Sequence, residues 1–153
     1  MPRRVYWDTN CFLGWFQQEP GKRDALRELL NEAEAGELVI VTSALAITEC
    51  AGLPTVRKIN DDASRKMLAF FEHEYIALRA VERTIAEKAH NLTRLLAIKH
   101  ADAIHVATAM TANVEVPQTW DEGILKHTGS ALIGLRIERP QDPSAGTLYE
   151  KET

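Results

Sequence analysis

The sequence is poor in cysteine, with only Cys11 and Cys50 among its 153 residues. The two form neither a C-x-x-C pair nor a disulfide framework, so we expect a reducing compartment. No apolar run approaches the roughly 18 residues of a membrane span. The arginines near the start are not followed by the apolar segment of a secretory signal. We therefore expect a cytoplasmic protein without a membrane segment.

Glycine and proline are also scarce, at 8 and 6 residues, which excludes a collagen-like or low-complexity chain. Positive charge is not in excess either: 18 Lys and Arg against 22 Asp and Glu give a net charge of −4. This balance argues against a protein that wraps nucleic acid with its whole surface. A local basic rim and a local acidic pocket for a cation both stay open. The 45% hydrophobic and 26% charged composition is typical of one globular domain.

The apolar pattern predicts that strands and helices alternate along the chain. The predicted strands are 5–7, 38–41, 75–81, 114–120 and 132–137. The predicted helices are 22–35, 44–50, one that Asp61 or Asp62 caps, 85–96, 102–112 and 121–127. This order predicts an α/β domain of three layers with a mostly parallel sheet.

Two features refine the predicted fold. The run 38–41 is apolar without alternation, which is typical of a strand buried on both faces. Pro117 removes a backbone donor from its strand and so favours an edge position. We expect one domain over residues 1–139, a pattern break at Pro54, and a loop or tail over 140–153.

Four acidic residues stand where the site of a parallel α/β fold is expected, at the carboxyl ends of strands. Asp8 and Asp121 follow predicted strands, and Glu49 lies on the short helix after 38–41. Asp102 starts the most apolar helix. The four carboxylates can therefore share one cleft, where their repulsion favours protonation or a bound divalent ion.

The same acids also have ordinary structural interpretations. Asp8, Asp102 and Asp121 are each positioned to cap the N-terminus of a helix, a place where aspartate is common. Glu49 can be a solvated helix residue. Position along the sequence alone does not decide between these interpretations and a shared site.

Four segments form a recognisable set: the strand-D-T-N start at 5–10, the segment 42–49 that ends in Glu49, the D-A-x-H-x-A-x-A helix at 99–109, and T-x-D at 119–121. Together they resemble the motifs of the PIN domain family of metal-dependent ribonucleases. The resemblance covers about residues 3–138, and the third motif is its most specific part. It implies a three-layer α/β/α fold. The length is most similar to VapC-type toxins, although Pro117 and Trp120 depart from the usual fourth motif.

The resemblance implies an endoribonuclease that uses Mg²⁺ or Mn²⁺, hard cations that prefer oxygen ligands. Asp8 and Asp102 are the expected metal ligands, and Glu49 and Asp121 complete the cluster through coordinated waters. Supporting hydrogen bonds to these acids are expected from Asn10, Thr119 and Thr9.

An RNA substrate, a small antitoxin and a homodimer are the expected partners. The basic residues best placed to hold RNA are Lys99, His100, Lys126 and His127; Arg3, Arg4, Lys22 and Arg23 are further candidates. The tryptophans, Trp7, Trp15 and Trp120, either stack on bases or belong to the core. Two alternatives stay open: a housekeeping RNA-processing nuclease without an antitoxin, and a non-catalytic PIN-shaped binding module.

Overall fold

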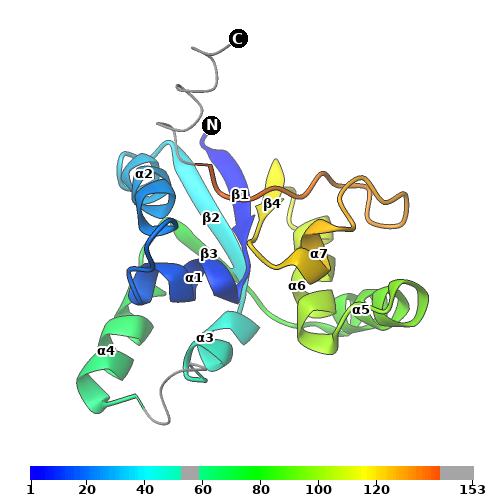
Figure 1. Cartoon of the computed structure of the whole chain (residues 1–153), viewed down its shortest axis with the longest axis horizontal. Helices are drawn as coiled ribbons and strands as arrows, with labels where there is room; N and C mark the ends of the chain where they lie inside the picture. The colour runs from blue at the N-terminus through cyan, green and yellow to red at the C-terminus, as the bar shows by residue number, and fades with distance from the viewer. Residues whose placement is uncertain (53–58, 142–153) are drawn as a thin grey trace.

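Strands and helices alternate in the computed structural model, which describes residues 1–52 and 59–141 (Figure 1). The elements are β1 (Arg3–Trp7), α1 (Thr9–Phe16), α2 (Arg23–Glu34), β2 (Leu38–Ser43), α3 (Leu45–Cys50), α4 (Asp61–Phe70), β3 (Ile76–Arg79), α5 (Arg83–Leu96), α6 (His100–Thr111), β4 (Val116–Gln118) and α7 (Glu122–Leu125). No helix within these ranges has the length and apolar content needed to cross a membrane.

The four strands form one parallel sheet in the order β3-β2-β1-β4. In its register, Val5 of β1 lies opposite Ile40 of β2 on one side and Val116 of β4 on the other. This confirms the predicted parallel sheet. Because every pair is parallel, all strands end at the same edge of the sheet, and the segments that follow them meet there.

Helices cover both faces of the sheet, as Figure 1 shows with α1 and α2 on one side and α5 and α6 on the other. Trp7 and Ile40 pack with α1 and α2 in one buried cluster. Their neighbours Tyr6 and Val41 point to the opposite face and pack against α6. The alternation of side chains along each strand therefore produces the predicted three layers.

Strand β4, which contains Pro117, lies at the edge of the sheet, as the missing backbone N–H of proline predicts. The Pro117 carbonyl accepts a hydrogen bond from the Glu138 N–H at 3.0 Å, on the side of β4 away from β1. The proline nitrogen therefore removes nothing from the pairing with β1. The strand is shorter than the predicted 114–120, at Val116–Gln118.

The predicted strand 132–137 is wrong. This segment makes turns and has no ladder contact within the described chain; the one isolated bridge lies just after it, between Gln118 and Glu138. Its buried apolar residues Ile133 and Ile137 pack against α5 and α6 instead. Burial against helices thus produced an apolar pattern without strand pairing.

Two helix starts also differ from the prediction. Asn60, not Asp61 or Asp62, caps α4 by accepting a hydrogen bond from the Ala63 N–H at 2.8 Å. The helix α6 begins at His100, so the structure places Asp102 in its first turn and the capping interpretation is wrong. The expected break at Pro54 lies outside the described residues, as does the expected tail from residue 142 on.

Candidate functional site

Asp8 lies at the end of the central strand β1 and is buried, with 4% of its surface exposed. One carboxylate oxygen, Oδ1, accepts a hydrogen bond from the Cys11 N–H at 3.3 Å and so caps α1. The other, Oδ2, accepts one from the Thr119 hydroxyl. Burial raises the pKa of Asp8, and the Thr119 hydrogen bond opposes this rise.

The segment after β4 is tied to the end of β1 through Thr119. While its hydroxyl donates to Asp8, the same oxygen accepts a hydrogen bond from the Asp121 N–H at 3.0 Å. Asp121 caps α7, where Oδ1 accepts from the Gly123 N–H at 2.8 Å. Asp8 and Asp121 are therefore helix caps that also belong to one linked group.

The negative charges of the other three acids affect the pKa of Asp102. Burial raises its pKa to about 6, and the negative charges of Asp121, Asp8 and, least, Glu49 add to the rise. The nearby His105 opposes it. Like charges act this way only at short range. Asp8 and Asp121 follow β1 and β4, and Glu49 lies on the helix that follows β2. The His105 that bonds Glu49 shares α6 with Asp102. The segments that carry the four acids therefore meet at the carboxyl edge of the sheet.

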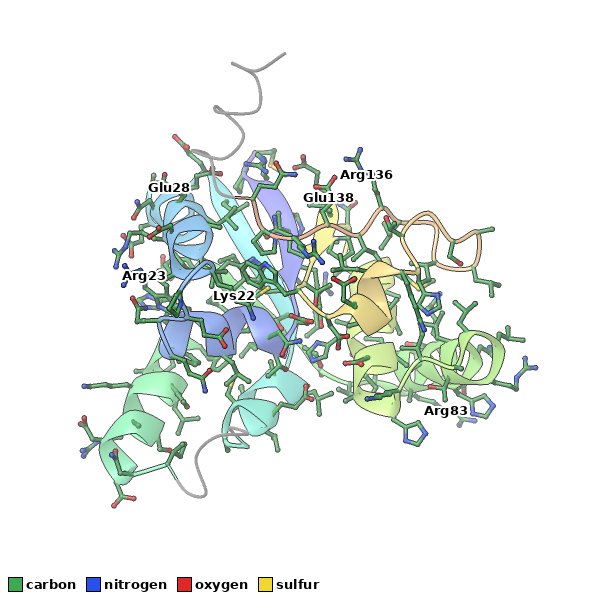
Figure 2. The ribbon with its side chains drawn as sticks, viewed as in Figure 1. Lys22, Arg23, Glu28, Arg83, Arg136 and Glu138 are labelled. Carbon is green, nitrogen blue, oxygen red and sulfur yellow. The ribbon has the colours of Figure 1, made fainter. Side chains whose placement is uncertain are left out.

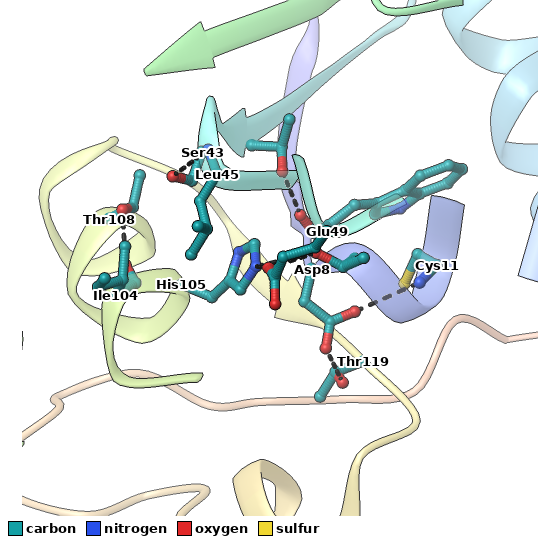
Figure 3. Close-up of polar contacts among 12 residues, drawn as sticks. Asp8, Cys11, Ser43, Leu45, Glu49, Ile104, His105, Thr108 and Thr119 are labelled. Carbon is teal, nitrogen blue, oxygen red and sulfur yellow. Dashed lines mark hydrogen bonds and ion pairs between the residues drawn. The ribbon is translucent and has the colours of Figure 1, made fainter. Parts of the chain in front are cut away.

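Glu49, on α3, is held by two neighbours (Figure 3). Its Oε1 accepts a hydrogen bond from the Thr9 hydroxyl at 2.7 Å and lies 2.7 Å from His105 Nε2. The His105 hydrogen bond lowers the pKa of Glu49, burial opposes this, and the Thr9 hydrogen bond lowers it further. Glu49 is thus stabilised as a carboxylate, in contrast to Asp102.

His105 connects three elements of the site and was not assigned a role from the sequence. It is 3% exposed, and its Nδ1 lies 2.7 Å from the Tyr6 hydroxyl. Burial raises the pKa of Tyr6, so this hydroxyl keeps its proton and can donate it. It also accepts from the Ser43 N–H at 3.1 Å. A hydrogen on His105 Nε2 then fits the carboxylate of Glu49.

A sequence signal for His105 existed. It is the histidine of the D-A-x-H helix and stands three residues after Asp102, which places both on one face of α6. Testing His100 and His105 only against the spacing of zinc ligands left this relation unused.

The supporting residues differ in what they contact. Thr9 bonds Glu49 and Thr119 bonds Asp8. The Asn10 side chain, in contrast, makes no hydrogen bond to any of the acids within residues 1–52 and 59–141. Trp7 is fully buried, and its Nε1 donates to Gln118 Oε1 at 2.9 Å. This indole belongs to the core and is not available to stack on a base.

The basic residues expected to bind RNA lie at the starts and ends of helices near the acids. Lys99 and His100 are exposed where α6 begins. Lys126 is exposed and His127 is half-buried, directly after α7.

The donor chemistry of the acids fits a hard divalent cation, since their carboxylate oxygens are the ligands that Mg²⁺ and Mn²⁺ prefer. Across the described ranges, no three or more His, Cys, Asp or Glu side chains are arranged to hold a metal by themselves. Mg²⁺ keeps several waters and commonly binds through only one or two carboxylates. A water-rich site on Asp8 and Asp102 therefore fits, and a cation there would relieve the repulsion that raises the pKa of Asp102.

Known proteins are similar to this chain in sequence and in fold. The family profile of the PIN domain matches residues 5–129. Two curated relatives from Mycobacterium tuberculosis are 29% identical over 148 residues, which covers 91% of this chain and 98% of each relative. They are named Ribonuclease VapC45, in strain CDC 1551, and Ribonuclease VapC49, in strain H37Rv.

Solved structures share the fold at lower identity. M. tuberculosis VapC20, described as a sarcin–ricin loop cleaving toxin, has a TM-score of 0.65 at 16% identity and covers 86% of this chain and 98% of its own. VapBC2 from Rickettsia felis, bound to a DNA fragment from its promoter, has a TM-score of 0.65 at 15% identity over 89% and 98% of the two chains.

Proposed function

Since this chain belongs to the PIN domain family, we propose that it is a metal-dependent endoribonuclease and the toxin of a toxin–antitoxin pair. The observation that carries the proposal is the hydrogen-bond network at the carboxyl edge of the sheet. Thr119 bonds both the Asp8 carboxylate and the Asp121 N–H. Glu49 bonds His105 of α6, the helix that also carries Asp102. A fold gains nothing from four carboxylates at close range unless a cation or a proton offsets them. The ribonuclease names of the relatives VapC45 and VapC49 support the same reaction.

Each acid has a role in the proposed site. Mg²⁺ or Mn²⁺, when bound, supplies a lowered water pKa and a positive charge beside the phosphate oxygens. Asp8 and Asp102 would hold the ion directly, and Asp121 would hold coordinated water. Glu49 has Oε1 engaged by Thr9 and His105. Its second oxygen makes no hydrogen bond within the described residues, so we assign it the orientation of the attacking water.

Partners are proposed from the neighbours in structure. The solved structures that share this fold include a toxin–antitoxin complex from Klebsiella pneumoniae, with a TM-score of 0.58 and 21% identity. We propose that a small antitoxin covers the acidic edge of this sheet and that the toxin is a homodimer. In cells, expression of the chain alone should stop growth, and co-expression of its antitoxin should restore it.

A cleavage assay tests the reaction. The purified protein should cut single-stranded RNA in Mg²⁺ or Mn²⁺, and EDTA should stop the cleavage. Asp8→Asn and Asp102→Asn should each lower the rate about 100-fold or more, because each removes a metal ligand. Glu28→Gln, an exposed acid on α2, is the matched control and should cut like the wild type.

The outcome against the proposal is cleavage that persists in EDTA or in both aspartate variants. Mapping the cut ends on total RNA, beside the Asp8 variant, would identify the target sequence.

A further inference from the structure

Lys22 stands at the rim of the acidic site, against the loop that carries Asp121. Its ammonium nitrogen lies 5.2 Å from the centre of the Trp120 ring, within the range of a cation–π contact. Trp120 is the residue between Thr119, which bonds Asp8, and Asp121. Lys22, which directly precedes α2, therefore contacts the loop that carries two residues of the site.

Lys22 is held in place from several sides. Its Nζ pairs with Glu19 Oε2 at 3.1 Å. Below its stem, a Cβ added at Gly14 would lie 3.5 Å from Lys22 Cδ and 3.3 Å from Glu19 Oε2. The absence of a side chain at Gly14 thus lets this pair pack directly on α1. A surface lysine normally keeps its rotamer freedom, and here that freedom is already reduced before any ligand binds.

The charge of Lys22 reaches the centre of the site. It opposes the rise in the pKa of the Cys11 thiol, and the N–H of the same Cys11 donates to the Asp8 carboxylate. Lys22 pairs with none of the four acids within the described chain, so it does not neutralise the cluster. About a third of its side chain, 31%, is open to solvent and to a ligand.

The neighbouring cation Arg23 is placed differently. It pairs with Asp24 at 3.7 Å, and its side chain is 58% exposed. In Figure 2, Lys22 lies toward the middle of the molecule and Arg23 on its outer side. Of these two adjacent basic residues, therefore, Lys22 lies nearer the acidic site at which a substrate would bind.

We propose that the Lys22 ammonium, seated on Trp120, binds a backbone phosphate of the RNA next to the phosphodiester that is cut. The inference rests on the proposed function and names the contact that holds its substrate. RNA that approaches a group of carboxylates meets repulsion, and a fixed cation at the rim offsets it. The phosphate takes the place of Glu19 as the counterion of Lys22.

The test measures binding of a short, fluorescently labelled single-stranded RNA by anisotropy over a series of KCl concentrations. Asp102→Asn is the background in every protein, so that the expected slow cleavage leaves the RNA intact during the measurement. Lys22→Met, which keeps the aliphatic stem, should weaken binding about fivefold, the upper range for one exposed ion pair. It should also reduce the slope of log K against log salt by about 0.7, which corresponds to one phosphate on a single strand.

Two further variants test whether RNA binding can also be strengthened and provide a control. Glu19→Gln removes the competing carboxylate and should tighten binding about twofold or more. The matched control Arg23→Met removes a cation one residue away and should leave both the affinity and the salt slope unchanged. Melting temperatures of all variants report whether each protein is folded, and the gain in Glu19→Gln carries the test if Lys22→Met does not fold.

Equal effects of Lys22→Met and Arg23→Met, or no gain in Glu19→Gln, would overturn the inference. The proposed function can hold even when this inference fails. If the wild type cuts RNA in Mg²⁺ while Lys22→Met binds normally, only this inference is lost. If the wild type cuts no RNA and the background protein binds none, the proposed function is lost as well.

Discussion

At the scale of single residues, the site holds two half-buried acids in opposite states. Burial and neighbouring carboxylates raise the pKa of Asp102 to about 6. The His105 hydrogen bond lowers the pKa of Glu49. One carboxyl is therefore costly to ionise and the other is stabilised as an anion. The protein therefore already offsets the charge of Glu49, whereas a bound cation would have to offset the charge of Asp102.

Asp102→Asn should stabilise the metal-free protein at pH 8 and not at pH 4. Because folding raises the pKa of Asp102 to about 6 from its usual value of 3.8, its contribution to stability is complete below pH 3.8. That contribution is lost as the pH rises through about 6. After solvent screening we expect about 1 kcal/mol, or roughly 2–4 °C in melting temperature, at pH 8.

Thermal melts of wild type and variant in EDTA at both pH values measure this effect. Glu28→Gln, on the exposed face of α2, serves as the control and should shift the melting temperature equally at both. An equal stabilisation by Asp102→Asn at pH 4 and pH 8 would contradict the assignment of the charge to this residue.

Tyr6→Phe tests the connection of β1 to His105. The change removes the partner of His105 Nδ1 and of the Ser43 N–H, both of them buried. Leaving such groups without a partner costs about 1–3 kcal/mol, which urea unfolding would measure. If Glu49 orients water, kcat should also fall while KM for RNA stays constant.

Tyr75→Phe is the matched control, since the Tyr75 hydroxyl makes no hydrogen bond in the described part of the chain. It should change stability by less than about 0.5 kcal/mol. A Tyr6→Phe variant that matches this control in both stability and kcat would show that the His105 connection is unimportant.

At the scale of elements, α5 ends in an unusual conformation. Ala97 closes this helix with φ of 57°, in the left-handed region that favours glycine. Ala97→Gly should therefore stabilise the protein by about 0.5–1 kcal/mol, measured by urea unfolding. Ala35, which closes α2 with φ of −77°, is the matched site, and Ala35→Gly should destabilise. Equal effects at the two positions would contradict this explanation.

The elements themselves were predictable wherever one physical pattern dominates. The stripe over 22–35 and the apolar run 38–41 gave α2 and β2 to within two residues at each end. The start of α6 was not predictable, because Lys99 makes no side-chain cap there and Asp102 is the first residue of a type that commonly caps helices. The predicted strand 132–137 failed because burial alone does not specify pairing.

The candidate site was predictable in its acids and not in its contacts. Asp8 and Asp121 could be placed because both follow strands of a parallel sheet. His105 bonds Thr9 and Tyr6 across 96 and 99 positions of sequence, a distance at which spacing carries no signal. Lys22 and Arg23 were equal candidates for RNA, and only the packing of α2 on α1 distinguishes them.

At the scale of the whole molecule, a divalent ion should couple the acids to the stability of the fold. Mn²⁺ at about 100 times its dissociation constant should stabilise the native state by about 2.7 kcal/mol and raise the melting temperature roughly 5–10 °C. The double variant Asp8→Asn, Asp102→Asn should lose this rise. An unchanged rise in the double variant would show that Mn²⁺ binds elsewhere.

The order of strands has a consequence for synthesis. The central strand β1 is made first, whereas β4, its neighbour on one side, is the last strand of the described chain. Thr119, whose hydroxyl donates a hydrogen bond to Asp8, follows Asp8 by 111 positions in the sequence. A polypeptide whose translation stops before β4 therefore lacks Thr119 and Asp121. Until β4 and the segment after it have been made, a nascent or terminated chain cannot form the proposed nuclease centre.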